Sequence, residues 1–417
     1  MDRLKIILVT IGSAGDVLPM LGLATALKAR DAEVLLAANG HFKGAADKAG
    51  VAFQEIGSVE KFDDIAKKKE VWHPRKGMKM LLKDVYLPAV EQVYDLIKAN
   101  RNDRTVVVAS VLAFGARIAH DKFKVPLVTL QLQPSVFWSP SRPAKFAGFG
   151  FVSRLPYSLR KALFALVDKL LDWQVAPHLN AFNRSVGLPP VRHVMSSWAV
   201  SPQTVVGLFP EWFARPASDW PANTRLVGFA GFDRLFSYDA ELSAEAVEFL
   251  SAGKKPVVFT PGTAMHHAKR FFEVALQAVQ RTGRRAIFLT LHRENLPPKL
   301  PDNVAHFDYI PLSLLLERSA MIVHHGGIGT VTQGLAAGIP QIITPFSFDQ
   351  PDNAARIEAV GAGGALRRLD AKALADMMEL ILNDDNIKAR CAELAARISF
   401  DETIEAACRA IEGAMRG

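Results

Sequence analysis

The stretch MIVHHGGIGTVTQGLAAGIPQIITPFSFDQPDNAARI, residues 321–357, places a glycine-rich turn between an apolar strand and a helix. The strand is predicted to end at Val323, residues 324–330 form the turn, and the next strand begins at Gln341. The first turn of a helix carries unpaired backbone N–H groups and partial positive charge. Because glycines let such a backbone approach an anion closely, the stretch predicts a phosphate-binding turn in an α/β protein.

Polar side chains accompany this turn and extend its chemistry. A histidine and Thr330 add hydrogen-bond donors at its mouth, and Asp349 and Gln350 follow the next strand. Hydrogen-bond donors that can bind a phosphate, followed by an acid and an amide that can bind hydroxyl groups, indicate a nucleotide-sugar site. The alternative interpretation is a structural strand–helix turn whose histidines cap the helix or fill the core.

Short apolar runs alternate with amphipathic stretches along both halves of the chain, which predicts parallel, doubly wound α/β sheets. The expected strands cover residues 5–10, 33–38, 51–56, 106–110, 126–131, 256–260, 285–290, 304–307, 322–323 and 341–344. The alternation breaks over residues 211–236, where residues 211–216 and 219–221 are expected to form a linker between domains. We expect one domain over residues 1–215, a second over 216–398, and a C-terminal helical segment over 399–417.

Composition narrows the class of protein. The chain has 417 residues, 22% of them charged, and only two cysteines without metal-ligand spacing, which favours a reducing compartment. It lacks an uninterrupted apolar run of 18 residues, so we expect no transmembrane helix. The net charge of +8 comes without any nucleic-acid-binding motif, and nucleic acid is not expected as a partner.

The pattern HHGGIGT…GIP…P…DQ…N resembles the donor-binding signature of family-1 glycosyltransferases, which have the GT-B fold. The resemblance implies two Rossmann-like domains facing a central cleft. The first would bind the acceptor, the second the nucleotide-sugar donor, and the C-terminal helix would return to the first domain. It also implies an inverting transfer in which the donor is a substrate and no cofactor takes part.

The same resemblance assigns donor-binding residues in the second domain. They are Thr260, Gly262, Thr263, Tyr309, Ile310, His325, Gly326, Gly327, Gly329, Thr330, Asp349 and Gln350. Tyr309 would stack on the base, although Leu312 cannot make the hydrogen bond of the family's glutamine. His325 is the histidine aligned to the diphosphate, and it would stabilise the leaving group as negative charge develops. The acid pair Asp384-Asp385 is not the spaced motif of metal-dependent transferases, so we expect no metal.

A glycine turn after the first predicted strand carries Ser13 and Asp16. By the resemblance, Ser13 lies at the acceptor and Asp16 is the general base that takes the acceptor's proton. The alternative role for Asp16 is to cap the following helix. We favour the base, even though the family's relay aspartate has no equivalent at Ala109 and Ser110.

Within the family, residues 201–206, 208–214 and 219–221 most resemble the rhamnosyltransferases of bacterial rhamnolipid synthesis. This implies dTDP-L-rhamnose as donor and a hydroxy fatty acid as acceptor. Phe137, Trp138 and Phe149 would then line an apolar acceptor channel, with packing inside the domain as the alternative. Other functions left open are a UDP-glucose-dependent transferase of a small hydrophobic aglycone, a nucleotide-sugar epimerase and a non-catalytic membrane partner.

Residues 142–173 interleave Arg and Lys with Phe, Leu and Trp. Such a stretch suits an anionic inner-membrane surface, or else a helix packed on its domain with the basic residues facing water. We favour the packed helix, and we expect a cytoplasmic enzyme with peripheral membrane contact as the alternative.

Overall fold

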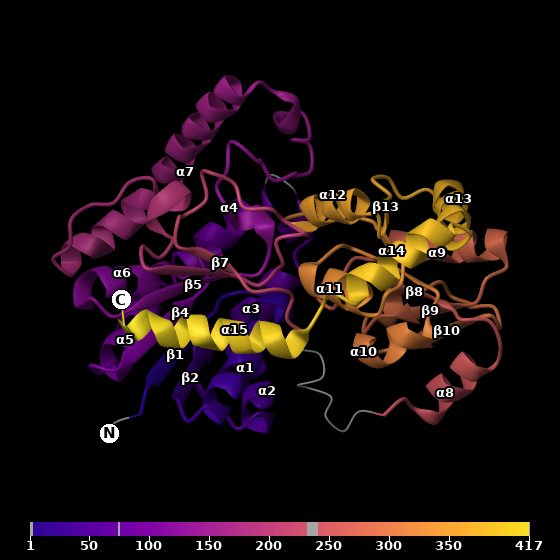
Figure 1. Ribbon diagram of the computed structural model, residues 1–417, viewed down its shortest axis with the longest axis horizontal. Coiled ribbons are helices and arrows are strands. Elements are labelled where there is room, and N and C mark those ends of the chain that lie inside the picture. The colour runs from indigo at the N-terminus through magenta and orange to yellow at the C-terminus, as the bar shows by residue number, and fades with distance from the viewer. Residues whose placement is uncertain (1–2, 74–75, 232–240, 417) are drawn as a thin grey trace. The chain divides into compact units, whose positions relative to one another are not determined.

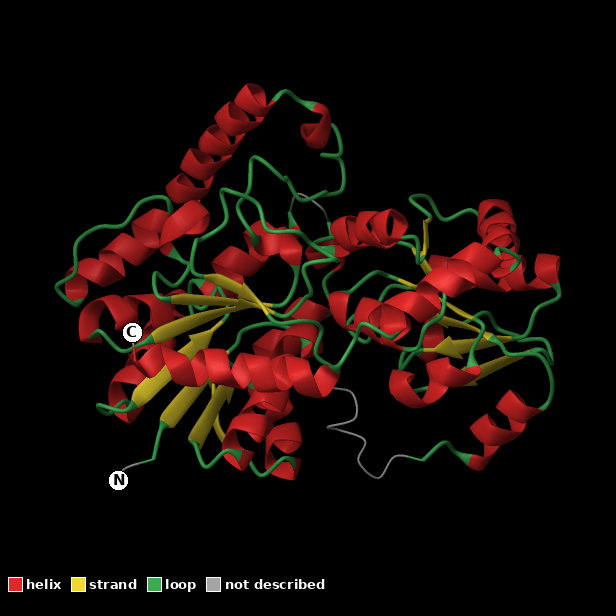
Figure 2. Ribbon diagram, viewed as in Figure 1, coloured by secondary structure: helices red, strands yellow, loops and turns green. Residues whose placement is uncertain are grey.

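The computed structural model describes residues 3–73, 76–231 and 241–416 (Figure 1). The chain divides into two compact units. The first comprises Met1–Ala230 together with Phe400–Gly417, and the second comprises Gly231–Ser399. Each unit is a parallel sheet with helices around it, as Figure 2 shows. The two doubly wound sheets expected from the sequence are therefore both present.

The first unit is built on a seven-stranded sheet in the order β3-β2-β1-β4-β5-β6-β7. Its strands are β1 (Lys5–Val9), β2 (Glu33–Ala38), β3 (Ala52–Glu55), β4 (Thr105–Ala109), β5 (Leu127–Gln131), β6 (Thr204–Gly207) and β7 (Thr224–Leu226). Ile7 pairs with Leu35 of β2 and Val107 of β4. Residues 6–9 are 0% exposed, because helices bury both faces of a parallel sheet.

The helices of the first unit include a return from the C-terminus. They are α1 (Ala14–Ala29), α2 (Lys43–Lys48), α3 (Val59–Ala66), α4 (Gly77–Leu81), α5 (Val90–Asn100), α6 (Phe114–Phe123), α7 (Tyr157–Ser185) and α15 (Phe400–Gly413). Helix α15 contacts α1, β4 and β6. The Arg30 guanidinium lies 2.7 Å from carboxylate oxygens of both Glu405 and Glu412, which joins the end of α1 to α15.

The first unit extends further along the chain than the predicted boundary after residue 215. Strand β7 pairs with β6, so it belongs to the first sheet. Residues 216–230 therefore lie with the first unit, although we assigned them to the second domain. Strands β6 and β7 were missing from the sequence-based set.

The second unit has a six-stranded parallel sheet in the order β10-β9-β8-β11-β12-β13. Its strands are β8 (Val257–Thr260), β9 (Ala286–Leu289), β10 (Val304–Phe307), β11 (Met321–His324), β12 (Gln341–Ile343) and β13 (Gly363–Ala365). Its helices are α8 (Ala244–Ser251), α9 (Lys269–Thr282), α10 (Leu312–Leu315), α11 (Ile328–Ala336), α12 (Gln350–Val360), α13 (Ala371–Leu382) and α14 (Asp385–Ala395).

The strand order reverses once in each sheet, and this positions the candidate sites. The chain runs from β1 outward to β3 and then places β4 on the other side of β1. In the second unit it runs from β8 outward to β10 and then places β11 on the other side of β8. Ligands of doubly wound sheets bind beyond the carboxyl ends of the strands at such reversals.

Helix α7 differs from the packed helix that we favoured. Its C-terminal half is buried, with Val175 and Leu179 at 0% exposure and Phe182 edge-on to Tyr94 of α5. Its N-terminal part extends away from the sheet in Figure 1, and large apolar side chains are exposed between Leu159 and Trp173, with Trp173 at 76%. Among the described residues, no helix is both long enough and apolar enough to span a bilayer.

Candidate active site

The predicted phosphate turn follows β11 in the second unit. Gly326 has a φ of +96°, and a Cβ added there would lie 2.5 Å from Cγ2 of Ile343. Only glycine fits such a position, because it has both a left-handed backbone and no space for a side chain. Gly327 is the N-cap of α11, so the turn leads directly into the free N–H groups of that helix.

His324 holds the turn from inside the core. Its Nδ1 accepts the Gly326 N–H at 3.1 Å, so its proton is on Nε2, which donates to Oε1 of Gln341 at 2.9 Å. The side chain is 0% exposed, and burial lowers the pKa of His324 from 6.5 to about 3. His324 is therefore a neutral structural residue, in agreement with the alignment of its neighbour, His325, to the diphosphate.

The His325 ring is enclosed by two glycines. A Cβ added to Gly262 would lie 2.6 Å from the ring carbon Cε1, and one added to Gly327 would lie 2.5 Å from Nε2. The Nδ1 atom is buried without a hydrogen-bond partner in the structure. Burial lowers the pKa of His325 to about 4, so the ring is neutral at pH 7 and offers one N–H donor. A buried, unsatisfied nitrogen beside a helix N-terminus is suited to a polar ligand.

The turn at residues 260–263 lies beside the His325 turn because β8 and β11 are neighbours. Thr260 pairs with His324 in the sheet, and the Thr260 hydroxyl accepts the Gly262 N–H at 3.2 Å. Thr263 is exposed at the same edge. Sequence alone left this turn as a generic one, whereas the pairing of β8 with β11 places it beside the predicted phosphate turn.

Asp349 and Gln350, the predicted sugar-binding pair, have different surroundings. Asp349 is half-buried, and its carboxylate accepts a 2.7 Å hydrogen bond from the Asn353 amide, which also donates to the Gly326 carbonyl at 2.9 Å. Gln350 is only 3% exposed, and its side-chain oxygen accepts the backbone N–H groups of residues 346 and 347 at 2.7 and 3.0 Å. Its oxygen is thus used to hold the loop before α12.

Asn353 is a residue whose role we did not predict, although it is the final position of the sequence signature. Its amide nitrogen donates both to the Gly326 carbonyl of the predicted phosphate turn and to Asp349. Its Oδ1 is buried without a partner in the structure. The side chain is 0% exposed. The sequence signature includes an asparagine at this position, but only the fold shows that it connects the turn after β11 with the start of α12.

The predicted base-binding residues follow β10, at the edge of the same sheet. Tyr309 is 55% exposed, so its ring is accessible for stacking. Ile310 is 6% exposed and packs in the core with Leu315 and Leu316. The side chain of Ile310 is therefore not available to a donor, and a contact there would have to use its backbone.

In the first unit, Asp16 both caps a helix and occupies the predicted base position. Its Oδ2 accepts the Ser13 backbone N–H at 2.9 Å and the Ser13 hydroxyl at 3.2 Å. A Cβ added to Gly12, which has a φ of +155°, would lie 2.3 Å from this Oδ2. Burial raises the pKa of Asp16 above 3.8, and the two Ser13 hydrogen bonds oppose the shift. Capping uses Oδ2, so the two roles are compatible.

Two further polar groups lie at this reversal of the first sheet. Tyr86 ends a π-helical turn, Leu82–Tyr86, and its pKa is raised first by burial and then by the negative charge of Asp16. The hydroxyl of Ser110, directly after β4, is buried without a partner. The sequence contained no signal for Tyr86, because its proximity to Asp16 depends on how the α4 segment folds back.

The predicted acceptor residues lie in three different environments. Phe137 is 7% exposed and stacks on Trp220 at 4.0 Å between ring centroids, so it is a core residue. Trp138 packs edge-on to Phe164 of α7. Phe149 is 40% exposed on the segment before α7. Of the three side chains, Phe137 is buried, Trp138 is half-buried and Phe149 is exposed.

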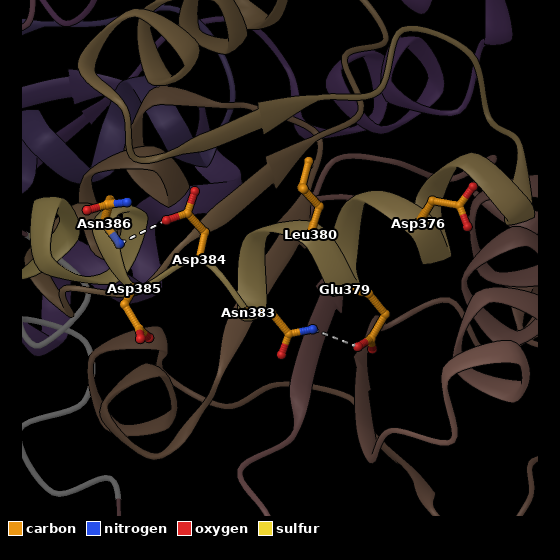
Figure 3. Close-up of a pocket in the computed structure, with 7 residues that line it drawn as sticks. All are labelled: Asp376, Glu379, Leu380, Asn383, Asp384, Asp385 and Asn386. Carbon is orange, nitrogen blue, oxygen red and sulfur yellow. Dashed lines mark hydrogen bonds between the residues drawn. The ribbon is translucent and has the colours of Figure 1, made fainter.

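A surface groove at the junction of α13 and α14 is lined mainly by acidic and amide side chains, which do not suit a negatively charged donor (Figure 3). Its lining residues are Asp376, Glu379, Leu380, Asn383, Asp384, Asp385 and Asn386. Asp384 accepts the Asn386 backbone N–H at 2.8 Å as the cap of α14, and Asp385 pairs with Lys388. Carboxylates repel a diphosphate, and these two are committed to structural contacts.

Two family profiles match the chain. Residues 6–137 match the glycosyltransferase family 28 N-terminal domain, and residues 278–407 match the C-terminal domain of erythromycin biosynthesis protein CIII-like proteins. The chain is 27% identical to the O-mycaminosyltylonolide 6-deoxyallosyltransferase of Streptomyces fradiae, covering 98% of this chain and 97% of that protein. It is 26% identical to a sterol 3-beta-glucosyltransferase of Arabidopsis thaliana, covering 97% of this chain and 67% of that protein.

Solved structures show the same architecture. The glycotransferase of kitacinnamycin matches with a TM-score of 0.74 and 19% identity, covering 98% of each chain. The spinosyn rhamnosyltransferase complexed with thymidine diphosphate matches with a TM-score of 0.64 and 20% identity, covering 94% of this chain and 96% of that one. These similarities confirm the predicted fold, name no rhamnolipid enzyme and give no support to the epimerase alternative.

Proposed function

Since the chain is a glycosyltransferase of the GT-B type with a nucleotide-sugar donor, we propose that it transfers L-rhamnose from dTDP-L-rhamnose to a hydroxy-fatty-acid lipid. The transfer inverts the anomeric carbon and uses neither a metal ion nor a cofactor. The observation that carries the donor-binding part of the proposal is the His325 ring between Gly262 and Gly327, with an unsatisfied nitrogen beside the start of α11.

The reaction is a single displacement. The acceptor hydroxyl gives its proton to the Asp16 carboxylate while its oxygen forms a bond to the anomeric carbon. The bond from that carbon to the diphosphate oxygen breaks, and the nucleoside diphosphate leaves with the electron pair. Desolvation makes Asp16 a stronger base than an exposed aspartate, because burial raises its pKa.

The leaving diphosphate is stabilised by hydrogen-bond donors more than by a full positive charge. Because the His325 ring is neutral, it supplies one N–H, and the N–H groups that open α11 supply the remainder with the helix dipole. Thr330, Gly329 and the turn at residues 260–263 complete this set. Asp349 holds sugar hydroxyls, Gln350 holds the loop that presents Asp349, and Tyr309 stacks on the base.

The rhamnosyl and lipid parts rest on sequence resemblance, with some support from the relatives. The spinosyn rhamnosyltransferase was solved with thymidine diphosphate, and the sterol glucosyltransferase is named for an apolar acceptor. We propose that Ser13 and Phe149 contact the acceptor in the first unit. A lipid acceptor also suits a cytoplasmic enzyme that contacts the inner membrane peripherally.

A donor screen tests the proposal. Purified protein would be incubated with a 3-hydroxy fatty acid dimer and either dTDP-L-rhamnose or UDP-glucose, and glycolipid product would be measured by mass spectrometry. We expect product from dTDP-L-rhamnose and at least tenfold less from UDP-glucose, since each well-made or missing polar contact changes discrimination by about 1–3 kcal/mol. Preferential use of UDP-glucose would overturn the rhamnosyl assignment.

The second candidate is a UDP-glucose-dependent transferase of a small hydrophobic aglycone. The similarity to a sterol 3-beta-glucosyltransferase favours it. Leu312 bears on both candidates, because it cannot hydrogen-bond to a ribose or a base. Adding sterol and phenolic acceptors to the same screen separates the two, since only the second candidate would glucosylate them.

A further inference from the structure

Helix α7 presents an apolar stripe to solvent along residues 159–177. Leu159, Leu163, Leu166, Leu170, Trp173 and Pro177 recur at alternating intervals of four and three residues, so they share one face of the helix. Leu159, Leu166, Leu170 and Trp173 are 55, 55, 51 and 76% exposed. At 1.5 Å per residue the stripe is about 27 Å long. Soluble proteins rarely leave such a continuous apolar surface without a use.

The opposite face of α7 makes polar contacts with residues 193 and 194 of the first unit. Asp168 is 5% exposed and its carboxylate lies 2.5 Å from Nδ1 of His193. Asp172 accepts the backbone N–H groups of His193 and Val194 at 2.6 and 2.8 Å. The helix is thus amphipathic in the reverse of the usual sense, with its polar anchors inward and its leucines outward.

The charge around the stripe has one sign. Residues 142–180 contain six Arg or Lys and only two acids, and both acids are the inward anchors Asp168 and Asp172. Lys161 and Lys169 on α7 and Arg154 before it are exposed. The preceding segment also exposes Phe146 and Phe151, at 44 and 54%. Exposed aromatic and leucine side chains with flanking cations match the surface of an anionic bilayer.

We infer that this surface, the leucine stripe of α7 with residues 142–154, docks the enzyme on an anionic phospholipid membrane. The stripe would lie in the plane of the headgroups, with Lys169 beside the stripe and Arg154 before α7 reaching lipid phosphates. A second copy of the chain is a poorer occupant. Like charges would face each other, and a pair of helices about 27 Å long buries less than the roughly 1,200–2,000 Å² of a stable interface.

The test is co-sedimentation of the full chain with lipid vesicles, without donor or acceptor. We expect binding to vesicles containing about one third phosphatidylglycerol, much weaker binding to phosphatidylcholine alone, and a decline with salt as the Debye length shortens. Leu166→Glu with Leu170→Glu should reduce vesicle binding at least tenfold, because it puts charge into the apolar face. Arg154→Glu with Lys169→Glu should remove the preference for anionic lipid.

Matched controls keep the result specific. Leu380→Glu changes a leucine that is 69% exposed on α13, and Lys254→Glu with Lys299→Glu makes the same charge change in the second unit. Both controls should bind vesicles like the parent protein. Circular dichroism and thermal melting would verify that each variant is folded.

Three results would overturn the inference: no binding to anionic vesicles, equal loss in the controls, or a change from dimer to monomer on Leu166→Glu with Leu170→Glu. The inference extends the proposed membrane contact but is measured without sugar transfer. Its failure would therefore leave the transferase reaction untouched, and a failed donor screen would not affect vesicle binding.

Discussion

The β1–α1 turn of the first unit and the β11–α11 turn of the second occupy equivalent places in their sheets, but their polar side chains are hydrogen-bonded differently. Each follows a strand at the reversal of its sheet, and each has a glycine with positive φ. In the first, Asp16 closes the turn on itself by accepting two hydrogen bonds from Ser13. In the second, the His325 ring lies against Gly262 and Gly327, and its Nδ1 has no hydrogen-bond partner in the structure.

The difference shows how one fold can provide two chemistries. Asp16 is a carboxylate whose pKa is raised by burial, which suits a group that takes a proton. His325 is a histidine whose pKa is lowered to about 4, which suits a neutral donor beside a helix N-terminus. Burial disfavours the charged form in both cases, but the consequence is basicity for the acid and neutrality for the histidine.

The largest effect is expected for Asp16→Asn, which removes the base without removing the cap. Asp16 is the third residue of α1, and the side-chain oxygen of an asparagine can still accept the Ser13 backbone N–H, so the turn should keep its shape. Transfer should fall about 10³-fold, within the usual range for a general base, while nucleotide affinity stays unchanged. Steady-state kinetics and calorimetric titration with dTDP measure the two quantities. Near-normal transfer would reduce Asp16 to its capping role.

The parent enzyme supplies a pH control for that substitution. Because burial raises the pKa of Asp16, kcat/KM should decline on the acid side at a pH above 3.8, as the carboxylate becomes protonated. The residual activity of Asp16→Asn should lack this decline. If both proteins follow the same acid limb, another group is responsible for it.

Gly262→Ala tests the second turn through its shape. The new Cβ would meet the His325 ring at 2.6 Å in a left-handed backbone. We expect the free energy of unfolding to fall by about 2–3 kcal/mol and dTDP to bind at least tenfold more weakly. Gly283→Ala is the matched control, because Gly283 is also left-handed, with a φ of +62°, but has open space around it.

The control should lose only about 1 kcal/mol and keep its dTDP affinity. Urea denaturation and calorimetry would measure both variants. Equal losses in the two would mean that backbone strain, and not the contact with the histidine ring, determines the effect of Gly262→Ala.

His324 should make the second turn sensitive to acid. Its folded-state pKa of about 3 is below the value of 6.5 expected when unfolded, so protonation favours the unfolded chain. Stability present above pH 6.5 is lost as the pH falls toward 3, by about 1.4 kcal/mol per pH unit. Compared with His324→Gln, the parent should lose about 2 kcal/mol more between pH 6.5 and 5. If the urea midpoints of the two proteins changed with pH by the same amount, this assignment would be contradicted.

The smallest effect is expected for Arg30→Ala, at the opposite end of the helix that Asp16 caps. Arg30 pairs with Glu405 and Glu412, but its side chain is 33% exposed and water screens the interaction. The free energy of unfolding should fall by less than about 1 kcal/mol, and less again in high salt. A loss above 2 kcal/mol in urea denaturation would show that α15 depends on this contact more than a surface ion pair allows.

Much of the local structure around residues 324–330 could be predicted from sequence because its parts are close together along the chain. The strand, glycines and helix of residues 321–357 are consecutive, and the signature separates His325 from His324. The contact between Gly262 and the His325 ring could not be predicted, since it depends on β8 and β11 being neighbours across about 60 residues of chain.

Side-chain direction was the main source of error. Gln350 has the right composition for a sugar ligand, yet its oxygen turns inward to two backbone amides. Phe137 fits an acceptor channel by type, yet it stacks on Trp220 in the core. The mixture of basic and apolar residues over 142–173 led us to favour a packed helix, but composition does not tell which side of a helix the protein covers.

The return of α15 to the first unit has a consequence for folding during synthesis. The second unit is an insertion between residues 230 and 400, so the ribosome completes it before the first unit is whole. Until Phe400–Gly413 emerges, the surface of α1, β4 and β6 that buries Cys408 and Ile411 remains open to water. We expect the unit that holds Asp16 to finish folding last, although its first strands are made first.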